Sequence, residues 1–380
     1  MAYSKRHKKN NRSGLISYGH QSINASDVSS VVSVLESDWL TQGPKVSEFE
    51  DELAKYCGAK YAVVVSSGTA ALHITYLASG IKAGDEAITT PNTFVATSNM
   101  ILAVGATPVF CDIRLDTYNI DEKKIESLIT PKTRAIVPVD FAGHPCDMDA
   151  INKIAQKNKL IVIEDACHSL GASYRGKKTG SLADMTAFSF HPVKHITTGE
   201  GGAVITNNLE YYNKLKYFRS HGIVKDNDGF NSMIDIGFNY RLSDIAASLG
   251  VSQLKRLDSF INKRRILVKA YIKNLKILKD IILPTETIDH SSWHIFVIRL
   301  KDPSRRFELM NYLKLAGIGS MIHYPAVYSH PYYRNNGYKN LSLGNEELYC
   351  KSCLTLPLHP ELLKSDILHV CSVIKKFFNS

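Results

Sequence analysis

The segment AFSFHPVKHITTGEGGAVITN, residues 187–207, places one lysine, Lys194, between His191 and His195 at the end of an apolar run. Such a segment can be a metal site, a phosphate-binding loop or the attachment point of a covalently held cofactor. A lone lysine on a loop is usually solvated, and two histidines alone are more often hydrogen-bonded structural residues than metal ligands. The segment by itself leaves all of these alternatives open.

Two other strand ends carry polar residues of the same kind. In VVVSSGTAAL, Gly68 and Thr69 stand where a strand turns into a helix, which offers free backbone N–H groups to a phosphate but is equally compatible with a plain tight turn. LIVIED ends on Glu164 and Asp165, and a carboxylate leaving so apolar a strand is either a helix cap or the counter-charge of a cation. Ligands of open α/β sheets bind at the carboxyl ends of the strands, so these residues and Lys194 can meet there.

The three strand ends together match the needs of pyridoxal phosphate. This cofactor requires an anchor for its phosphate, an anion that keeps its pyridine nitrogen protonated, and an amine that forms a Schiff base. The sequence therefore predicts a pyridoxal phosphate site built around Lys194 and Asp165.

The elements that would position these residues alternate along the chain. Between about residues 60 and 206 we expect strands in YAVVVSS, EAITT, TPVFCD, RAIVPVD, LIVIED, MTAFSF and GAVITN, with helical patterns such as GTAALHITYLAS, DEKKIESLI and DMDAINKIAQK between them. The last of these begins with Asp147, which suits an N-cap. Alternation of this kind predicts an α/β domain with a largely parallel sheet.

The pattern changes after residue 240 to long helical stretches, followed by the strand WHIFVIRL and the helix RRFELMNYLKLAG. We therefore predict a basic disordered arm over residues 1–14, a cofactor-binding large domain over 15–260 and a C-terminal small domain over 261–380. The length of 380 residues suits such a division.

Composition narrows the class of protein. Hydrophobic residues make up 44% of the chain, and no apolar run approaches the roughly 18 to 20 residues that cross a bilayer, so we expect no membrane span. The basic N-terminus lacks the apolar stretch of a secretory signal, and the seven cysteines are odd in number and scattered, which together predict a cytoplasmic protein. Cys350 and Cys353 form the one close pair, and without a second such pair we expect ordinary apolar residues and no metal site.

The net charge of +10 raises the possibility of a nucleic-acid or membrane-surface binder. Half of that charge comes from the arm, which carries Lys5, Arg6, Lys8, Lys9 and Arg12 and no acid. No zinc finger, RNP motif or similar module follows, so we expect no nucleic-acid partner. A mildly basic body also suits an anionic small substrate.

Long motifs resemble a known family. The segments SSGTAALH, EDACHSLGA, SFHPVKHITTGEGG, GFNYRLSDIAASLGVSQL, GIGSMIHYPAVYSHPYYR and LPLHPEL are similar to the DegT/StrS family of sugar aminotransferases, over nearly the whole chain from about Ile16. The resemblance implies the fold-type-I architecture, in which a large domain with a mixed, mostly parallel sheet between helices is joined to a smaller C-terminal α/β domain. It also implies a pyridoxal phosphate enzyme that works as a homodimer with shared active sites.

The resemblance further implies roles for individual residues. Lys194 would form the Schiff base and move the proton between cofactor and substrate carbons, and Asp165 would pair with the pyridinium nitrogen. Phe94 would lie over the ring and His168 beside the cofactor, although Phe94 could instead be plain core. The phosphate ligands would be Gly68, Thr69 and Ser189.

Further positions match segments that involve a second subunit or the substrate. Asn239 corresponds to a residue that reaches the phosphate from the other subunit, with a helix cap near Leu242 as the alternative. The residues that would line the sugar-nucleotide site are Tyr18, Thr41, Gly43, His323 and Tyr324. The last two stand in HYPAV, which departs from the HYIPV expected there.

Within the family, ISYGHQSI, SDWLTQGPKVSEFE and FHPVKHITTGEGG are most similar to the transaminases of pseudaminic acid biosynthesis. This similarity implies transfer of an amino group from glutamate to C4 of a UDP-linked 4-keto-6-deoxy sugar. Alternatives are another nucleotide keto sugar, aminated at C3 or linked to dTDP, a sugar dehydratase, and a cofactor-binding regulator without turnover. Dehydratases of the family carry histidine in place of the lysine, and a regulator would need an added binding domain or a lost lysine, so Lys194 favours transamination.

Overall fold

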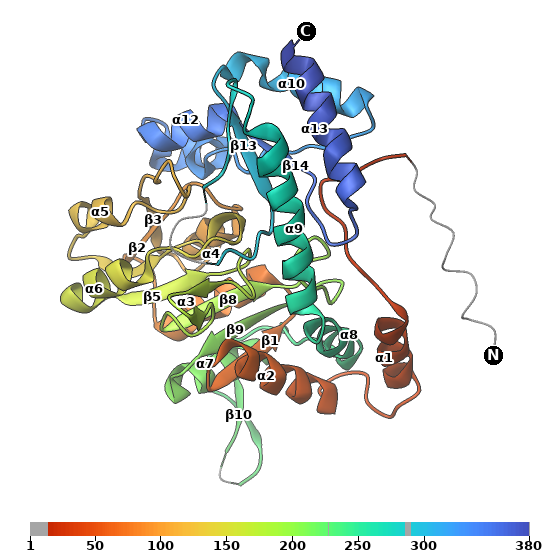
Figure 1. Ribbon diagram of the computed structural model, residues 1–380. Helices are drawn as coiled ribbons and strands as arrows, with labels where there is room; N and C mark the ends of the chain where they lie inside the picture. The colour runs from red at the N-terminus through yellow and green to blue at the C-terminus, as the bar shows by residue number, and fades with distance from the viewer. Residues whose placement is uncertain (1–13, 227, 286–289, 380) are drawn as a thin grey trace.

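The computed structural model describes residues 14–226, 228–285 and 290–379 (Figure 1). Of the predicted basic arm, only the last residue falls within this range, so that prediction lies outside the described residues. Within the described part, no helix is long and apolar enough to cross a membrane.

A seven-stranded sheet forms the centre of the larger part of the molecule. Its strands lie in the order β1-β9-β8-β5-β4-β2-β3. Their bounds are β1 Tyr61–Val65, β2 Glu86–Thr89, β3 Thr107–Phe110, β4 Thr133–Val137, β5 Ile161–Asp165, β8 Met185–Ser189 and β9 Gly202–Thr206. The strands from β8 to β3 run parallel, whereas β9 runs antiparallel to both β1 and β8. All seven predicted strands are confirmed, and the sheet is mixed and mostly parallel.

The strands are buried on both faces, as strands between two helical layers must be. In β1, Val63 and Val65 pack in one apolar cluster while Ala62 and Val64 pack in another on the opposite face. The first cluster includes residues of α3 Gly68–Ser79, α4 Ala96–Ala103 and α7 Leu209–Arg219. The second includes residues of α2 Pro44–Cys57, α8 Asp244–Leu254 and the start of α9 Leu257–Leu275, and α1 Ala25–Leu35 packs on α8.

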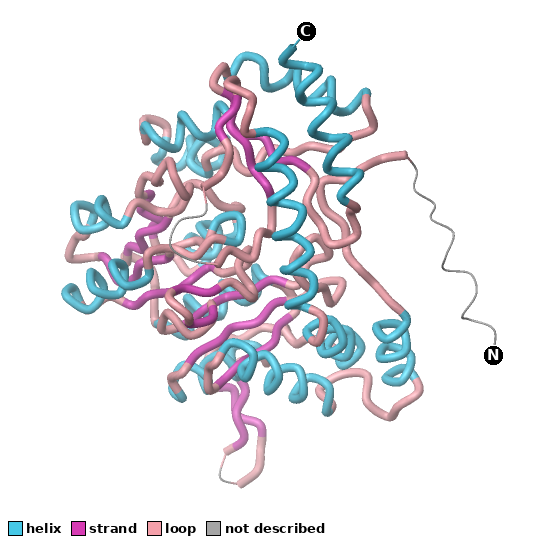
Figure 2. The backbone as a smooth tube through the Cα atoms, viewed as in Figure 1, coloured by secondary structure: helices cyan, strands magenta, loops and turns pink. Residues whose placement is uncertain are grey.

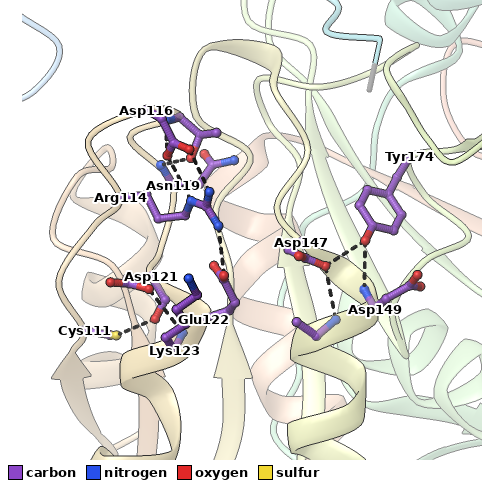
Figure 3. A network of polar contacts seen from close by, with 12 residues as sticks. Cys111, Arg114, Asp116, Asn119, Asp121, Glu122, Lys123, Asp147, Asp149 and Tyr174 are labelled. Atoms are coloured by element: carbon purple, nitrogen blue, oxygen red, sulfur yellow. Dashed lines mark hydrogen bonds and ion pairs between the residues drawn. The ribbon is translucent and has the colours of Figure 1, made fainter. Parts of the chain in front are cut away.

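Local polar contacts fix the ends of the helices beside the sheet. Asp147 caps α6 Met148–Asn158 as predicted, because its Oδ1 accepts the backbone N–H of Ala150 at 3.2 Å and the hydroxyl of Tyr174 at 2.7 Å (Figure 3). A second network at α5 Glu122–Ile125 joins the Arg114 guanidinium to Asp116 and Glu122. These contacts hold the segments that follow β3 and β4.

A smaller sheet, in the order β12-β13-β14, forms the C-terminal part (Figure 2). Its strands are β12 Ile281–Ile282, β13 Phe296–Leu300 and β14 Cys353–Leu356, and its helices are α10 Arg306–Leu315, α11 Pro331–Tyr333, α12 Gly344–Ser352 and α13 Lys364–Asn379. Two hairpins complete the fold, β6 Ser173–Tyr174 with β7 Lys177–Lys178, and β10 Ile223–Lys225 with β11 Asn231–Met233. The second hairpin projects from the body of the molecule (Figure 1).

Helix α9 connects the two parts, and residue 260, near which we predicted a domain boundary, lies inside it. Leu257 and Ile261 pack with the large sheet, whereas Leu267 and Tyr271 pack with the small one. The N-terminal segment also crosses between the parts, because the N–H of Ile16 donates to the carbonyl of Gly317 at 2.8 Å. The division at residue 260 remains a prediction, with a shared helix at that point.

Candidate active site

Asp165 stands at the carboxyl end of β5, where it is 4% exposed. Its Oδ2 accepts the hydroxyl of Thr97 at 2.6 Å, and its Oδ1 accepts the backbone N–H of Cys167 at 3.2 Å. Thr97 is in turn 2.7 Å from the hydroxyl of Thr93. The carboxylate is therefore held in one orientation by hydroxyl and amide groups, and Asp165 caps no helix.

Lys194 lies in the connection from β8 to β9, whose turn is closed by the N–H of Lys194 and the carbonyl of His191 at 2.8 Å. Part of the side chain remains accessible, yet burial lowers the pKa of the amine, while the neighbouring Cys167 and Asp165 act against this decrease. The structure thus brings Lys194 and Asp165 close to each other. An amine with a lowered pKa is a better nucleophile and base at neutral pH.

The histidines that flank Lys194 lie in different surroundings. His191 is exposed, whereas His195 is buried and its Nε2 lies 3.2 Å from the carbonyl oxygen of Ser292. Within the described residues, no cluster of three or more histidine, cysteine or acidic side chains could hold a metal ion.

A narrow cradle forms where α3 begins beside the end of β8. Ser67 caps α3 by accepting the N–H of Ala70 at 3.1 Å. A Cβ added to Gly68 would lie only 2.8 Å from the Cβ of Ser189 and 3.2 Å from its Oγ, so glycine is required here. Thr69 is exposed next to it. The predicted phosphate ligands Gly68, Thr69 and Ser189 therefore lie at one helix N-terminus, where backbone N–H groups and the helix dipole favour an anion.

His168 occupies the centre of an aromatic cluster close to Lys194. Its Nε2 lies 3.1 Å from the hydroxyl of Tyr324, and its ring centroid lies 4.3 Å from that of His294. Burial lowers the pKa of both rings well below the usual range, and the charge of Lys194 contributes to each decrease. Both histidines are therefore neutral at pH 7.

The predicted aromatic residues Phe94, Tyr18 and His323 extend this cluster. Phe94 is 59% exposed, with its ring 6.3 Å from that of Tyr324, so it does not belong to the core. The ring of His323 lies 5.6 Å from that of Tyr18, and its Nδ1 lies 2.9 Å from the hydroxyl of Thr355. Burial lowers the pKa of His323 to about 4.

Three predicted residues lie apart from this cluster. Thr41 is exposed and forms a backbone bridge with Ser243, and the N–H of Gly43 donates to Asp244 Oδ2 at 2.7 Å. Asn239 is exposed as well, and it does not cap α8, because the side chain of Ser243 accepts the N–H of Ala246 there. In the described part of the chain, no contact joins these three to Lys194 or Asp165.

Two residues of the site were not predicted from the sequence, Thr97 beside Asp165 and His294 beside His168. Thr97 belongs to the same NTFVAT segment as Phe94, so its position after a strand was a usable signal. His294 lies in the predicted strand WHIFVIRL, two residues before β13 begins in the structure, and nothing in its local pattern separates it from a core position. Its proximity to His168 arises only from packing between the two parts of the molecule.

The site fits pyridoxal phosphate. Gly68, because it lacks a Cβ, packs directly against Ser189 at the N-terminus of α3, Asp165 offers an oriented carboxylate, and Lys194 offers an amine near that carboxylate. In addition, the Nδ1 atoms of His168 and His294 are buried and make no hydrogen bond within the described residues. Such atoms are expected beside a polar ligand.

Comparisons with known proteins agree with this geometry. The model of the DegT/DnrJ/EryC1/StrS aminotransferase family matches residues 21–375. A UDP-4-amino-4,6-dideoxy-N-acetyl-beta-L-altrosamine transaminase from Campylobacter jejuni is 43% identical over 360 residues, which cover 93% of this chain and 94% of that protein.

Solved structures are similar over comparable lengths. Helicobacter pylori PseC, an aminotransferase involved in the biosynthesis of pseudaminic acid, superposes with a TM-score of 0.92 at 34% identity, covering 96% of this chain and 99% of that one. Spr1654 from Streptococcus pneumoniae, solved in a PLP-form and a PMP-form, gives a TM-score of 0.90 at 30% identity over 95% of this chain and 98% of its own.

Proposed function

This chain belongs to the DegT/DnrJ/EryC1/StrS aminotransferase family, and we propose that it transfers an amino group from glutamate to C4 of a UDP-linked 4-keto-6-deoxy amino sugar. Pyridoxal phosphate is the cofactor, as the family and the PLP-form neighbour indicate. The single observation that carries the proposal is the position of Lys194 near Asp165, beside the Gly68 and Ser189 contact at the start of α3.

Each part of the site has a task in this reaction. Pyridoxal phosphate, when bound, supplies an aldehyde for amines and a ring that accepts electrons. Lys194 would hold it through Nζ and afterwards carry the proton between the reacting carbons, for which the lowered pKa of its amine is suited. Asp165 would keep the ring nitrogen protonated, and Gly68, Thr69 and Ser189 would hold the phosphate.

The sugar is proposed from similarity to two proteins. The C. jejuni transaminase and H. pylori PseC are both similar to this chain over more than nine-tenths of its length. Tyr18 and His323 form an aromatic wall, His323 lies near enough to Lys194 for that amine to lower its pKa further, and both are proposed as sugar contacts. Phe94, exposed beside Tyr324, is proposed to cover the cofactor ring.

The substrate is tested by mass spectrometry of products after incubation with glutamate and a panel of nucleotide keto sugars. We expect a 4-amino product from the UDP-linked 4-keto-6-deoxy sugar. An amine at C3, or use of dTDP-sugars with refusal of UDP-sugars, would contradict the proposed sugar while leaving the family unchanged.

We also propose that two copies of the chain share their active sites. The projecting β10–β11 hairpin and the segment after it expose Phe230, Met233, Ile234 and Ile236, each more than half accessible, and Asn239 follows them. Exposed apolar surface of this extent is typical of association sites. Asn239, together with Thr41 and Gly43, would then complete the site of the partner.

Subunit mixing tests this arrangement. A Lys194→Ala chain and an Asn239→Ala chain are each expected to be inactive alone, and their heterodimer should regain one sound site. Absence of recovery, with subunit exchange confirmed by a tag on one chain, would place Asn239 within its own subunit's site or outside any site.

The cytoplasm is the compartment we propose, because all seven cysteines are free thiols. Five of them are buried, and Cys353 packs in an apolar cluster with Tyr349. The location can be tested by separating producing cells into fractions and detecting the chain in each with an antibody. Recovery in a secreted fraction would contradict the proposed compartment.

A further inference from the structure

Tyr324 contacts His168, the residue that the resemblance places beside the cofactor. His168 Nε2 lies 3.1 Å from the hydroxyl of Tyr324, and it is the one hydrogen-bond partner of that hydroxyl among the described residues. The other ring nitrogen of His168, Nδ1, is buried without a hydrogen bond within the same part of the chain. Tyr324, which comes from the C-terminal part of the chain, therefore binds one nitrogen of the His168 ring. The second nitrogen remains available to a bound ligand.

Protonation states restrict how this pair can be arranged. Burial lowers the pKa of His168 well below its usual range, so the ring is neutral and carries one N–H. Burial raises the pKa of Tyr324 above its usual range, so the hydroxyl keeps its hydrogen. Either the hydroxyl donates to Nε2, which places the ring hydrogen on Nδ1, or Nε2 carries the hydrogen and donates to the tyrosine oxygen.

The first arrangement satisfies more groups. It leaves only the N–H of Nδ1 without a partner in the described chain, whereas the second leaves both the tyrosine hydrogen and Nδ1 unpaired, and each buried polar group without a hydrogen bond lowers stability. The tautomer of a histidine is set by the bond that its other nitrogen makes. We propose that Tyr324 is a positioning residue that fixes the hydrogen of His168 on Nδ1 and so presents a donor to the oxygen atoms of pyridoxal phosphate.

Surrounding contacts hold the His168 ring for this purpose. The His294 ring packs 4.3 Å from it, and the backbone of His294 is fixed by its N–H to the carbonyl of Ala142 and by its carbonyl to the Arg264 guanidinium, both at 2.9 Å. The carbonyl of His168 also accepts the hydroxyl of Ser292 at 3.3 Å. The ring of His168 therefore lies between the Tyr324 hydroxyl and a His294 residue whose backbone is held on both sides.

The proposed role of Tyr324 depends on the binding of pyridoxal phosphate and not on the identity of the sugar, so it and the proposed substrate can fail separately. The direct test is NMR of the loaded enzyme labelled with ¹⁵N-histidine, with the His168 signals assigned by their loss in His168→Gln. We expect the hydrogen on Nδ1 in the wild type. A hydrogen on Nε2 would overturn the proposal without any variant of Tyr324 being needed.

Cofactor affinity supplies a second test. Tyr324→Phe should raise the dissociation constant of pyridoxal phosphate about five- to tenfold, the effect of one hydrogen bond, and should add nothing in a His168→Gln background. Tyr271→Phe is the matched control, because its buried hydroxyl donates to the carbonyl of Pro357 at 2.9 Å inside the small domain, and its cofactor affinity should be unchanged. If Tyr324→Phe raises only the KM for the sugar and leaves cofactor affinity unchanged, Tyr324 acts on substrate and the proposal is wrong.

Discussion

The bond from Thr97 to Asp165 gives the sharpest test of the site. Thr97→Val keeps the shape of the side chain and removes the hydroxyl that donates to Asp165 Oδ2 at 2.6 Å. The hydroxyl of Thr93, 2.7 Å from Thr97, loses its partner at the same time. Among the described residues, Asp165 then keeps its contacts with Cys167 but loses the hydroxyl bond at Oδ2, so the carboxylate is less firmly oriented toward the ring nitrogen.

The size of the effect follows from the kind of bond. A hydrogen bond to a charged group contributes about 1.5 to 3 kcal/mol. At about 1.4 kcal/mol per factor of ten, the loss corresponds to a decrease in kcat/KM of about 10- to 150-fold. The decrease should appear already in the half-reaction with glutamate, followed by the absorbance of the bound cofactor, because Asp165 acts on the cofactor and not on the sugar.

Two further variants separate this effect from a loss of stability. Thr97→Ser retains the hydroxyl and should recover most of the activity. Thr75→Val removes a buried hydroxyl that donates to the carbonyl of Ala71 at 2.6 Å in α3, and it should lower stability without changing the half-reaction. A half-reaction within about twofold of the wild type in Thr97→Val would refute the orienting role of this bond.

Three other predictions concern single residues. Lys194→Ala should leave the fold intact, as judged by circular dichroism, but abolish both turnover and the visible absorbance of the lysine-bound cofactor; wild-type rates in this variant would exclude the mechanism. Asp165→Asn should reduce kcat by orders of magnitude while cofactor still binds, since the anion facing the ring nitrogen is gone; near-normal activity would place the cofactor elsewhere. Burial, partly offset by hydrogen bonds from Ser169 and Cys146, raises the pKa of Asp140 to about 6. Because this folded-state pKa lies above the unfolded value, the stabilisation is complete at low pH and is lost as pH rises through about 6, so the free energy of unfolding of the apo-protein should decline over this range. Urea denaturation between pH 4 and 8 should show a smaller decline in Asp140→Asn, and identical slopes would contradict the assignment.

The sequence specified the parts of the site that are local. Each of the seven strands of the main sheet is a short apolar run, and the rule that ligands lie at strand ends was enough to bring Asp165, Lys194 and Gly68 together. What local pattern cannot supply is contact between distant segments. Tyr324 and His168 are 156 positions apart, and Thr97 and Asp165 are 68 apart, so both pairs depend on how the elements pack.

The residues that the resemblance assigned to the sugar-binding site lie in two places in the structure, again because packing of distant segments decides their positions. His323 and Tyr18 meet, whereas Thr41 and Gly43 lie beside α8, where Ser243 and Asp244 hold them. Spacing along a chain contains no information about which surface a second subunit covers. The role of Asn239 is accordingly a question about assembly, which subunit mixing answers.

The N-terminal segment that crosses to the small domain also affects the order in which the enzyme can be completed during synthesis. Ile16 pairs with Ile318, and the carbonyl of Tyr18 accepts the N–H of Leu358 at 3.0 Å. Residues that are synthesised early therefore have partners that are synthesised near the end of the chain. A nascent chain that has reached residue 275 already contains every strand of the main sheet together with Lys194 and Asp165. The wall of Tyr18 and His323 can form only when translation is nearly finished, and until then the growing chain exposes an incomplete pocket to the cell.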